Sequence, residues 1–141
     1  MKKISFISLF LLFVVYAFAQ DNAAELLRKA SLKMDAKDYK EVLSLLNKAI
    51  SLDSGDPECY ALRGQAKHNL NDLNAALLDY NKALELTPNY AEVYSLRGMV
   101  KGDLKDPKGA CEDWEKAYEF GYKKALELLS KYCNDVMDPK K

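Results

Sequence analysis

An internal repeat constrains this chain more than any other feature. When the 141-residue sequence is shifted against itself by 34 positions, residues 23–56, 57–90 and 91–124 superimpose without a gap. The string LRG, for example, occurs at 62–64 and again at 96–98. Repeats of this length are small supersecondary units that bury their apolar faces by stacking on one another. The sequence therefore predicts three tandem copies of one unit.

Each copy reads as an antiparallel pair of helices. It holds two apolar runs with the periodicity of an α-helix, separated by a short polar break. Asp38, Asp72 and Asp106 stand at the same place before the second run, where a carboxylate can accept the free N–H groups of a helix's first turn. We expect an all-α chain, an α-solenoid of three helical hairpins. Residues 125–141 supply a capping helix and a tail, with the helix extending from 123 to 134.

The pattern resembles the tetratricopeptide repeat (TPR). Small residues fill the eighth, twentieth and twenty-seventh positions of the copies, large apolar residues fill the fourth and twenty-fourth, and the resemblance covers all three copies plus the following helix. The small positions allow the two helices to approach, with Gly64 near Ala76 and Gly98 near Ala110. The proline of the family pattern at the thirty-second position occurs only as Pro88, so each copy is a variant.

Antiparallel register pairs charged residues across each hairpin. Residues equidistant from the turn lie opposite each other, which places Arg63 opposite Asp79 and Arg97 opposite Asp113. An ion pair repeated at matched positions is interpreted as a structural contact that sets helix register. The alternative, a catalytic pair, lacks a partner base.

The same register places Cys111 opposite Cys133 if the last hairpin turns about residues 121–122. We hypothesise a disulfide, which would staple the cap in an oxidising compartment; two packed thiols are the alternative. Cys59 is expected in the core, where it packs as a small apolar residue. No metal or other cofactor is expected, because close C-x-x-C pairs are missing and His68 is the sole histidine.

Signals for catalysis are weak. The sequence contains no nucleophile motif and no glycine-rich phosphate-binding string, so His68 is interpreted as a solvated groove residue and the chain as a non-enzyme. Aromatic residues recur at helical and repeat spacing, which favours a core role over a ligand cage. These residues are Tyr60, Tyr80, Tyr94, Trp114 and Tyr118.

The N-terminus has the features of a secretory signal peptide. Lys2 and Lys3 precede an apolar stretch over 4–19 that ends in a small-x-small pattern, so 1–19 is predicted as the signal, with cleavage before Gln20. This stretch is shorter than a bilayer-spanning helix needs to be. We expect a periplasmic or secreted protein without a membrane span after cleavage. Retention of the segment as an anchor is the alternative.

The family resemblance implies where a partner binds. In TPR proteins the first helices of the repeats line a concave groove for a peptide or a partner's helix. The corresponding residues here are Arg28, Ser31, Met34, Gln65, His68, Asn69, Met99 and Asp103. Family members that clamp a C-terminal carboxylate use a Lys, Asn and Arg set that this groove lacks apart from Arg28. We expect no carboxylate clamp and an extended segment with apolar and basic side chains instead.

Charge balance completes the functional prediction. The chain has 21 basic and 21 acidic residues, so no excess charge points to nucleic acid. We predict a non-catalytic, exported scaffold that binds a peptide or partner protein in its concave groove. A small structural subunit of a cell-envelope assembly is the alternative, and an enzyme or thiol-redox protein ranks third.

Overall fold

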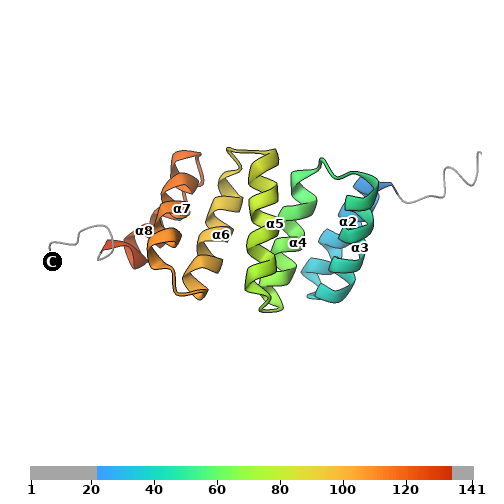
Figure 1. Cartoon of the computed structure of the whole chain (residues 1–141), viewed down its shortest axis with the longest axis horizontal. Coiled ribbons are helices and arrows are strands. Elements are labelled where there is room, and N and C mark those ends of the chain that lie inside the picture. Colours follow the sequence, from blue (N-terminus) through green and yellow to red (C-terminus); the bar gives the residue numbers. More distant parts are fainter. Residues whose placement is uncertain (1–21, 135–141) are drawn as a thin grey trace, which may run out of the picture.

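Helices arranged in a row make up the described part of the chain. The computed structural model describes residues 22–134, which form seven helices and no strand. The expected signal peptide at 1–19 and the tail at 135–141 lie outside these residues. Figure 1 shows three hairpins standing side by side, followed by the cap. The helices are α2 (Ala23–Asp35), α3 (Tyr39–Leu52), α4 (Pro57–Asn69), α5 (Leu73–Leu86), α6 (Ala91–Asp103), α7 (Pro107–Glu119) and α8 (Ala125–Tyr132). The predicted all-α class is confirmed.

Aspartate caps begin the second helix of each hairpin. The carboxylates of Asp38, Asp72 and Asp106 accept the backbone N–H three residues further on, at 3.3, 3.4 and 2.9 Å. Each cap satisfies one of the four N–H groups that a helix leaves unpaired at its start. The hairpin turns are therefore encoded locally, at the same place in every copy.

Left-handed residues make the chain reversal possible just before those caps. Lys37, Asn71 and Lys105 have φ values of 59°, 62° and 64°. They occupy the same place in the three copies, so the three turns share one backbone conformation. A lysine has a steric cost in this region, and the sequence pattern did not mark these positions.

Glycine in the first helix makes room for an aromatic ring. A Cβ on Gly64 would lie 2.9 Å from the ring of Tyr80, and one on Gly98 would lie 2.6 Å from Nε1 of Trp114. The sequence had paired Gly64 with Ala76; the structure shows that the aromatic side chain one turn further along α5 is what requires the glycine. For Gly98 the carbonyl of Ala110 is also close, at 3.0 Å.

The aromatic core is as expected except at its end. Tyr60, Tyr80, Tyr94 and Trp114 are buried, whereas Tyr118 is 46% exposed. The prediction for Tyr118 was wrong: the equivalent Leu84 of the second hairpin is buried, with a further hairpin packed on that one, whereas within residues 22–134 only the short α8 packs on α7.

A buried carboxylate joins the two helices of the second hairpin. Asp79 accepts hydrogen bonds from Nε and Nη2 of Arg63, at 2.9 and 2.7 Å, and its Oδ2 lies 2.7 Å from Nζ of Lys67. Arg63 also donates to Asn47 on α3, at 2.8 Å, and so links this hairpin to the one before it. We call these four side chains the ion cluster of the second hairpin.

The third hairpin has the same cluster at the equivalent positions. Asp113 accepts from Arg97 at 2.8 and 2.7 Å and lies 2.9 Å from Lys101, and Arg97 reaches back to Asn81 on α5 at 2.8 Å. In the first hairpin the buried Leu45 stands where the later ones have the carboxylate. The structure thus brings together both predicted pairs, Arg63 with Asp79 and Arg97 with Asp113. A lysine and an asparagine join each pair, and the sequence analysis did not predict them.

A disulfide holds the cap. Cys111 on α7 is bonded to Cys133, directly after α8, with their Cα atoms 5.8 Å apart. The helix is shorter than the expected 123–134, because residues 123–124 form a turn and the chain leaves the helix at Cys133. The ring of Tyr132 lies 5.7 Å from that of Trp114. The last hairpin is therefore covered by one short helix that is covalently attached.

Removal of one cation from an ion cluster should destabilise the fold. We expect Arg97→Ala to lower the free energy of unfolding by about 3 kcal/mol, because it leaves the buried carboxylate of Asp113 short of a partner. The exposed Arg28, whose ion pair with Glu25 lies on the surface, serves as the control, and Arg28→Ala should leave unfolding unchanged. Denaturant unfolding followed by circular dichroism measures both. Equal effects of the two substitutions would contradict the structural role of the cluster.

Reduction of the disulfide should destabilise the cap end. Its ends are 22 residues apart, and closing a loop of that size stabilises a folded chain by about 3 kcal/mol in the chain-entropy model. Reductant should therefore lower the unfolding midpoint of the protein, and it should have no effect on a Cys111→Ala/Cys133→Ala variant. Thiol titration of the unfolded, unreduced protein should count only Cys59; a count of three would disprove the bond.

Candidate functional site

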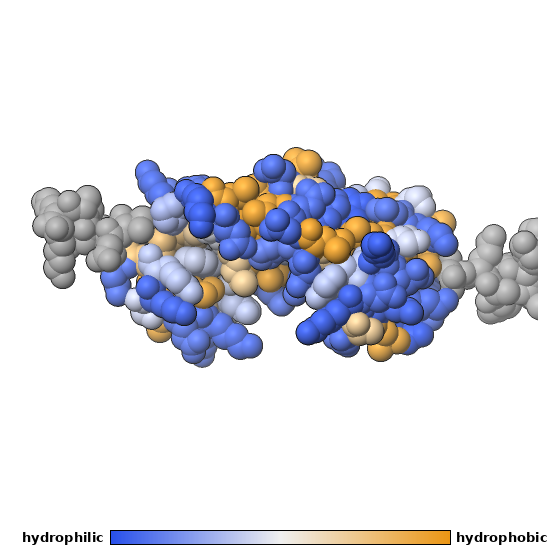
Figure 2. All heavy atoms as spheres, turned by 90° about the horizontal axis from the view of Figure 1, so that it is seen from below, coloured by the Kyte–Doolittle hydropathy of each residue, from blue (hydrophilic) through white to orange (hydrophobic). Residues whose placement is uncertain are grey.

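The first helices of the hairpins form the inner face of the row. Helices α2 and α4, and likewise α4 and α6, approach each other more closely than successive second helices do. The stack therefore bends toward α2, α4 and α6. Viewed from below in Figure 2, the body is bowed, with an indentation in the middle of one long edge. All the predicted groove residues belong to these three helices.

Two predicted groove residues bind each other. Nε2 of His68 on α4 lies 2.7 Å from Oδ2 of Asp103 on α6, and only 17% of the histidine side chain is exposed. The pair spans neighbouring hairpins at the end where their turns lie. His68 is thus a bridge between repeats, which corrects its interpretation as a solvated side chain.

Three more of the predicted residues have their polar atoms engaged within the chain. Asn69 donates to the carbonyl of Gln65 at 2.8 Å and accepts from the hydroxyl of Tyr39 at 3.2 Å. Ser31 donates to the carbonyl of Leu27. Arg28 donates twice to Glu25, one helical turn away, at 2.9 and 2.8 Å. The hydrogen-bonding groups of these side chains are therefore used within the chain.

Gln65, Met34 and Met99 are the predicted groove residues that remain available. Gln65 and Met34 are partly buried, and Met99 is 43% exposed on α6. Flexible methionine side chains adapt to apolar ligands of varied shape. The inner face therefore offers an apolar, adaptable contact at α6 and an amide at α4.

A narrow groove runs between α4 and α6. Its volume is about 130 Å³, and it is lined by apolar residues of both helices together with Gln65 and two carboxylates. The lining residues are Glu58, Ala61, Leu62, Gln65, Tyr90, Glu92, Val93 and Leu96. We call this the α4–α6 groove. Polar groups make up the larger part of its exposed lining, with apolar side chains of both helices between them, and this mixture suits the backbone and short side chains of an extended peptide.

A second hollow adjoins this groove at the ends of the helices opposite the hairpin turns. It has a volume of about 580 Å³ and is formed where α4 and α6 begin and where the chain leaves α7. Its walls include Asp56, Glu58, Tyr90, Glu92, Phe120 and Tyr122. We call it the loop-end hollow. Glu58, Tyr90 and Glu92 belong to both the hollow and the groove.

Tyr90 lies at the junction of groove and hollow. Burial raises the pKa of its phenol, and the carboxylates of Glu58, Glu92 and Asp56 raise it further. Sequence reasoning missed this residue and its neighbours Phe120 and Tyr122. A sequence signal does exist for these three residues, since each is an aromatic residue at a loop between helical units, outside the apolar pattern of the helices.

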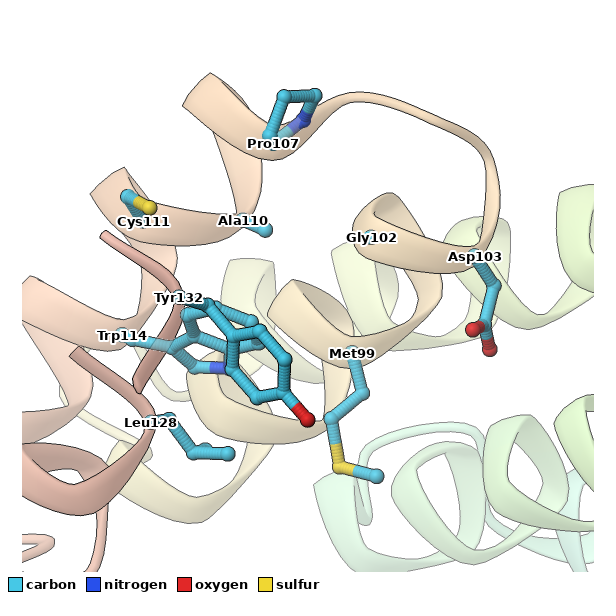
Figure 3. A pocket seen from close by; sticks show the side chains of 9 residues that line it. All are labelled: Met99, Gly102, Asp103, Pro107, Ala110, Cys111, Trp114, Leu128 and Tyr132. Carbon is cyan, nitrogen blue, oxygen red and sulfur yellow. The ribbon is translucent and has the colours of Figure 1, made fainter. Parts of the chain in front are cut away.

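A third hollow lies under the cap. It has a volume of about 390 Å³ and is bordered by α6, α7 and α8. Figure 3 shows Trp114 and Tyr132 side by side at its centre, with Met99 on the facing helix. The inner face thus continues past α6 to the disulfide-held helix.

In the part of the chain that the structure describes, groups capable of nucleophilic or metal chemistry are not gathered into one site. Burial raises the pKa of Cys59 to about 11, so its thiol stays protonated at neutral pH. Among residues 22–134, no group of three or more His, Cys, Asp or Glu side chains is placed to hold a metal ion. Within the same range no helix has the length and apolar character required to cross a membrane.

Comparison with known proteins agrees with the helical-hairpin repeat seen in the structure. A family model described as TPR repeat matches residues 64–104, which extend from α4 to the C-cap of α6. The chain has the fold of a TPR protein. No curated protein matches it.

Solved TPR domains superimpose on most of the chain. The first TPR of Spaghetti (RPAP3), bound to the HSP90 peptide SRMEEVD, is 24% identical with a TM-score of 0.77, over 82% of this chain and 94% of that one. The first TPR domain of human RPAP3 is 25% identical, with a TM-score of 0.76 over 82% and 92%. The Sgt2 TPR domain from Aspergillus fumigatus is 24% identical, with a TM-score of 0.72 over 81% and 80%. At this level of identity the likeness concerns the TPR fold.

Proposed function

We propose that this TPR protein binds an extended peptide segment of a partner protein on its inner face. The observation that carries the proposal is the α4–α6 groove, where the amide of Gln65 lies among apolar side chains of both helices. The exposed Met99, further along α6, borders the hollow under the cap and extends the same face. Support comes from two similar folds: the Spaghetti (RPAP3) domain is bound to an HSP90 peptide, and the TPR2B domain of yeast Sti1 forms a complex with pHsp70.

The ligand should differ from a C-terminal carboxylate. A carboxylate clamp needs several free cationic and amide donors, and Arg28 is the single lysine or arginine among the predicted groove residues. Glu58 and Glu92 line the groove and would repel an anionic peptide end. The charges therefore favour an internal or basic segment of the partner.

A binding role is inferred in preference to a catalytic one. The thiol of Cys59 is buried, and His68 is engaged with Asp103. Within residues 22–134 the His68–Asp103 pair makes no hydrogen bond to a serine, threonine or cysteine side chain, and so lacks the nucleophile of a catalytic set.

We also propose that the protein acts outside the cytoplasm, in the periplasm or secreted. The predicted signal peptide at 1–19 is the basis of this proposal. The Cys111–Cys133 disulfide supports it, since such bonds persist in oxidising compartments and are rare in reducing ones.

Site-specific photo-crosslinking tests the groove. A photoreactive residue placed at Gln65 or Met99 should form an adduct with the partner in the producing cell, identified by mass spectrometry. The matched control is Leu78, which is 70% exposed on α5, away from the groove. With the partner in hand, Met99→Ala should weaken binding about fivefold through lost apolar contact, and Leu78→Ala should not. Adducts formed equally from Leu78 would favour the structural-subunit alternative.

The mass of the mature protein tests export. Protein recovered from outside the cytoplasm should have the mass of a chain that begins at Gln20. Ala17→Arg removes a small residue that the signal peptidase requires and should leave the full-length chain attached to the membrane. A full-length, uncleaved wild-type protein in the cytoplasm would contradict the proposal.

A further inference from the structure

We propose that the loop-end hollow receives the side chain of a lysine or arginine from the peptide held in the α4–α6 groove. The inference rests on the proposed function and specifies which ligand the groove selects. The sequence predicted binding on the inner faces of the first helices. The hollow lies outside those faces, where α4 and α6 begin and the chain leaves α7.

The hollow and the groove form one continuous surface. Glu58, Tyr90 and Glu92 border both, so a peptide backbone lying between α4 and α6 passes the mouth of the hollow. The hollow is shallow and open to solvent, and it lies beside the end of the groove. A long side chain that leaves the groove at this end can therefore lie across it.

The carboxylates that line the hollow favour the binding of a cation. Asp56, Glu58 and Glu92 contribute three carboxylates, and no lysine or arginine is part of its lining within residues 22–134. Asp56 accepts the N–H of Glu58 at 2.9 Å and so caps α4. The side chains of Glu58 and Glu92 have no ion-pair partner in this part of the chain, and both residues are exposed. A bound cation would be the counter-ion that the chain itself does not supply.

The aromatic rings distinguish a basic side chain from a simple metal ion. Tyr90, Phe120 and Tyr122 line the same hollow, and Phe120 is held in place by the ring of Tyr94, 5.6 Å away. The methylene stem of a lysine or arginine packs on such rings while its head reaches the carboxylates, and the ring faces attract the charge itself. A hydrated metal ion would gain little from the three rings.

Two features oppose cation binding, and both are outweighed. The N-termini of α4 and α6 each carry about half a positive charge, less in total than the three carboxylates. Arg97 and Lys116 lie on the ring of Tyr94, at 5.3 and 5.6 Å. Arg97 is neutralised by Asp113, so Lys116 and the two helix ends together contribute about two positive charges near three carboxylates. The balance in the hollow stays negative.

A pair of peptides tests the proposal on the whole mature protein. Amide signals are followed by nuclear magnetic resonance during titration with Ac-Ala-Leu-Lys-Leu-Ala-NH2, and with the same peptide carrying norleucine in place of lysine. We expect the lysine peptide to shift the amides of residues 90–92 and 120–122 and to bind about fivefold to tenfold more tightly, as a cation over aromatic rings does when partly desolvated. In a Glu58→Gln/Glu92→Gln variant this preference should disappear, while the norleucine peptide binds as before.

Glu112→Gln, which removes an exposed carboxylate on α7, is the matched control and should keep the full preference. Circular dichroism verifies that both variants remain folded. If both peptides bind the α4–α6 groove equally well, or if the lysine preference survives in the double variant, this inference fails and the proposed function stands. If neither peptide perturbs α4 or α6 up to its solubility limit, the groove itself is not a peptide site and both proposals fail.

Discussion

A two-helix hairpin of this size has apolar residues on both of its broad sides and hides only part of them by folding on itself. Everything else in the molecule follows from the need to cover the remainder. The second hairpin lies between two neighbours, so its core residues, such as Tyr80 and Ala83, are fully buried. Within residues 22–134, the third has a hairpin on one side and α8 alone on the other. Tyr118 is correspondingly half-exposed, and the disulfide at Cys133 attaches this short covering helix to α7.

Polar contacts then determine how the hairpins align. A buried carboxylate has a high desolvation cost unless it is fully paired, and Asp79 and Asp113 each receive an arginine and a lysine. Because each arginine also reaches an asparagine of the preceding hairpin, the register within one unit is linked to the stacking of the next. The first hairpin has Leu45 in place of the carboxylate. It takes part in the link through Asn47, which accepts a hydrogen bond from the arginine of the second hairpin.

The inner face is shaped by the same need for partners. Residues that a simple projection of the family pattern assigns to ligand binding, such as His68 and Asp103, are joined to each other across two hairpins. What stays available is the α4–α6 groove with the amide of Gln65, the acidic, aromatic hollow at its end, and the hollow under the cap that Met99 borders. The surfaces that remain open therefore depend on which side chains the fold leaves without a partner.

The repeat period and the hairpin register are local properties, and for that reason the sequence alone determined them. Helix periodicity, the aspartate caps and the antiparallel register depend on neighbours within one unit, so the pairing of Arg63 with Asp79 and of Cys111 with Cys133 could be predicted from residue positions alone. The His68–Asp103 bridge and the loop-end hollow join residues of different units. Those contacts depend on how whole hairpins bend and stack. A small change in the angle between two units moves the side chains of one relative to the other. The sequence pattern of each repeat is the same at every such angle, so it does not predict the contacts.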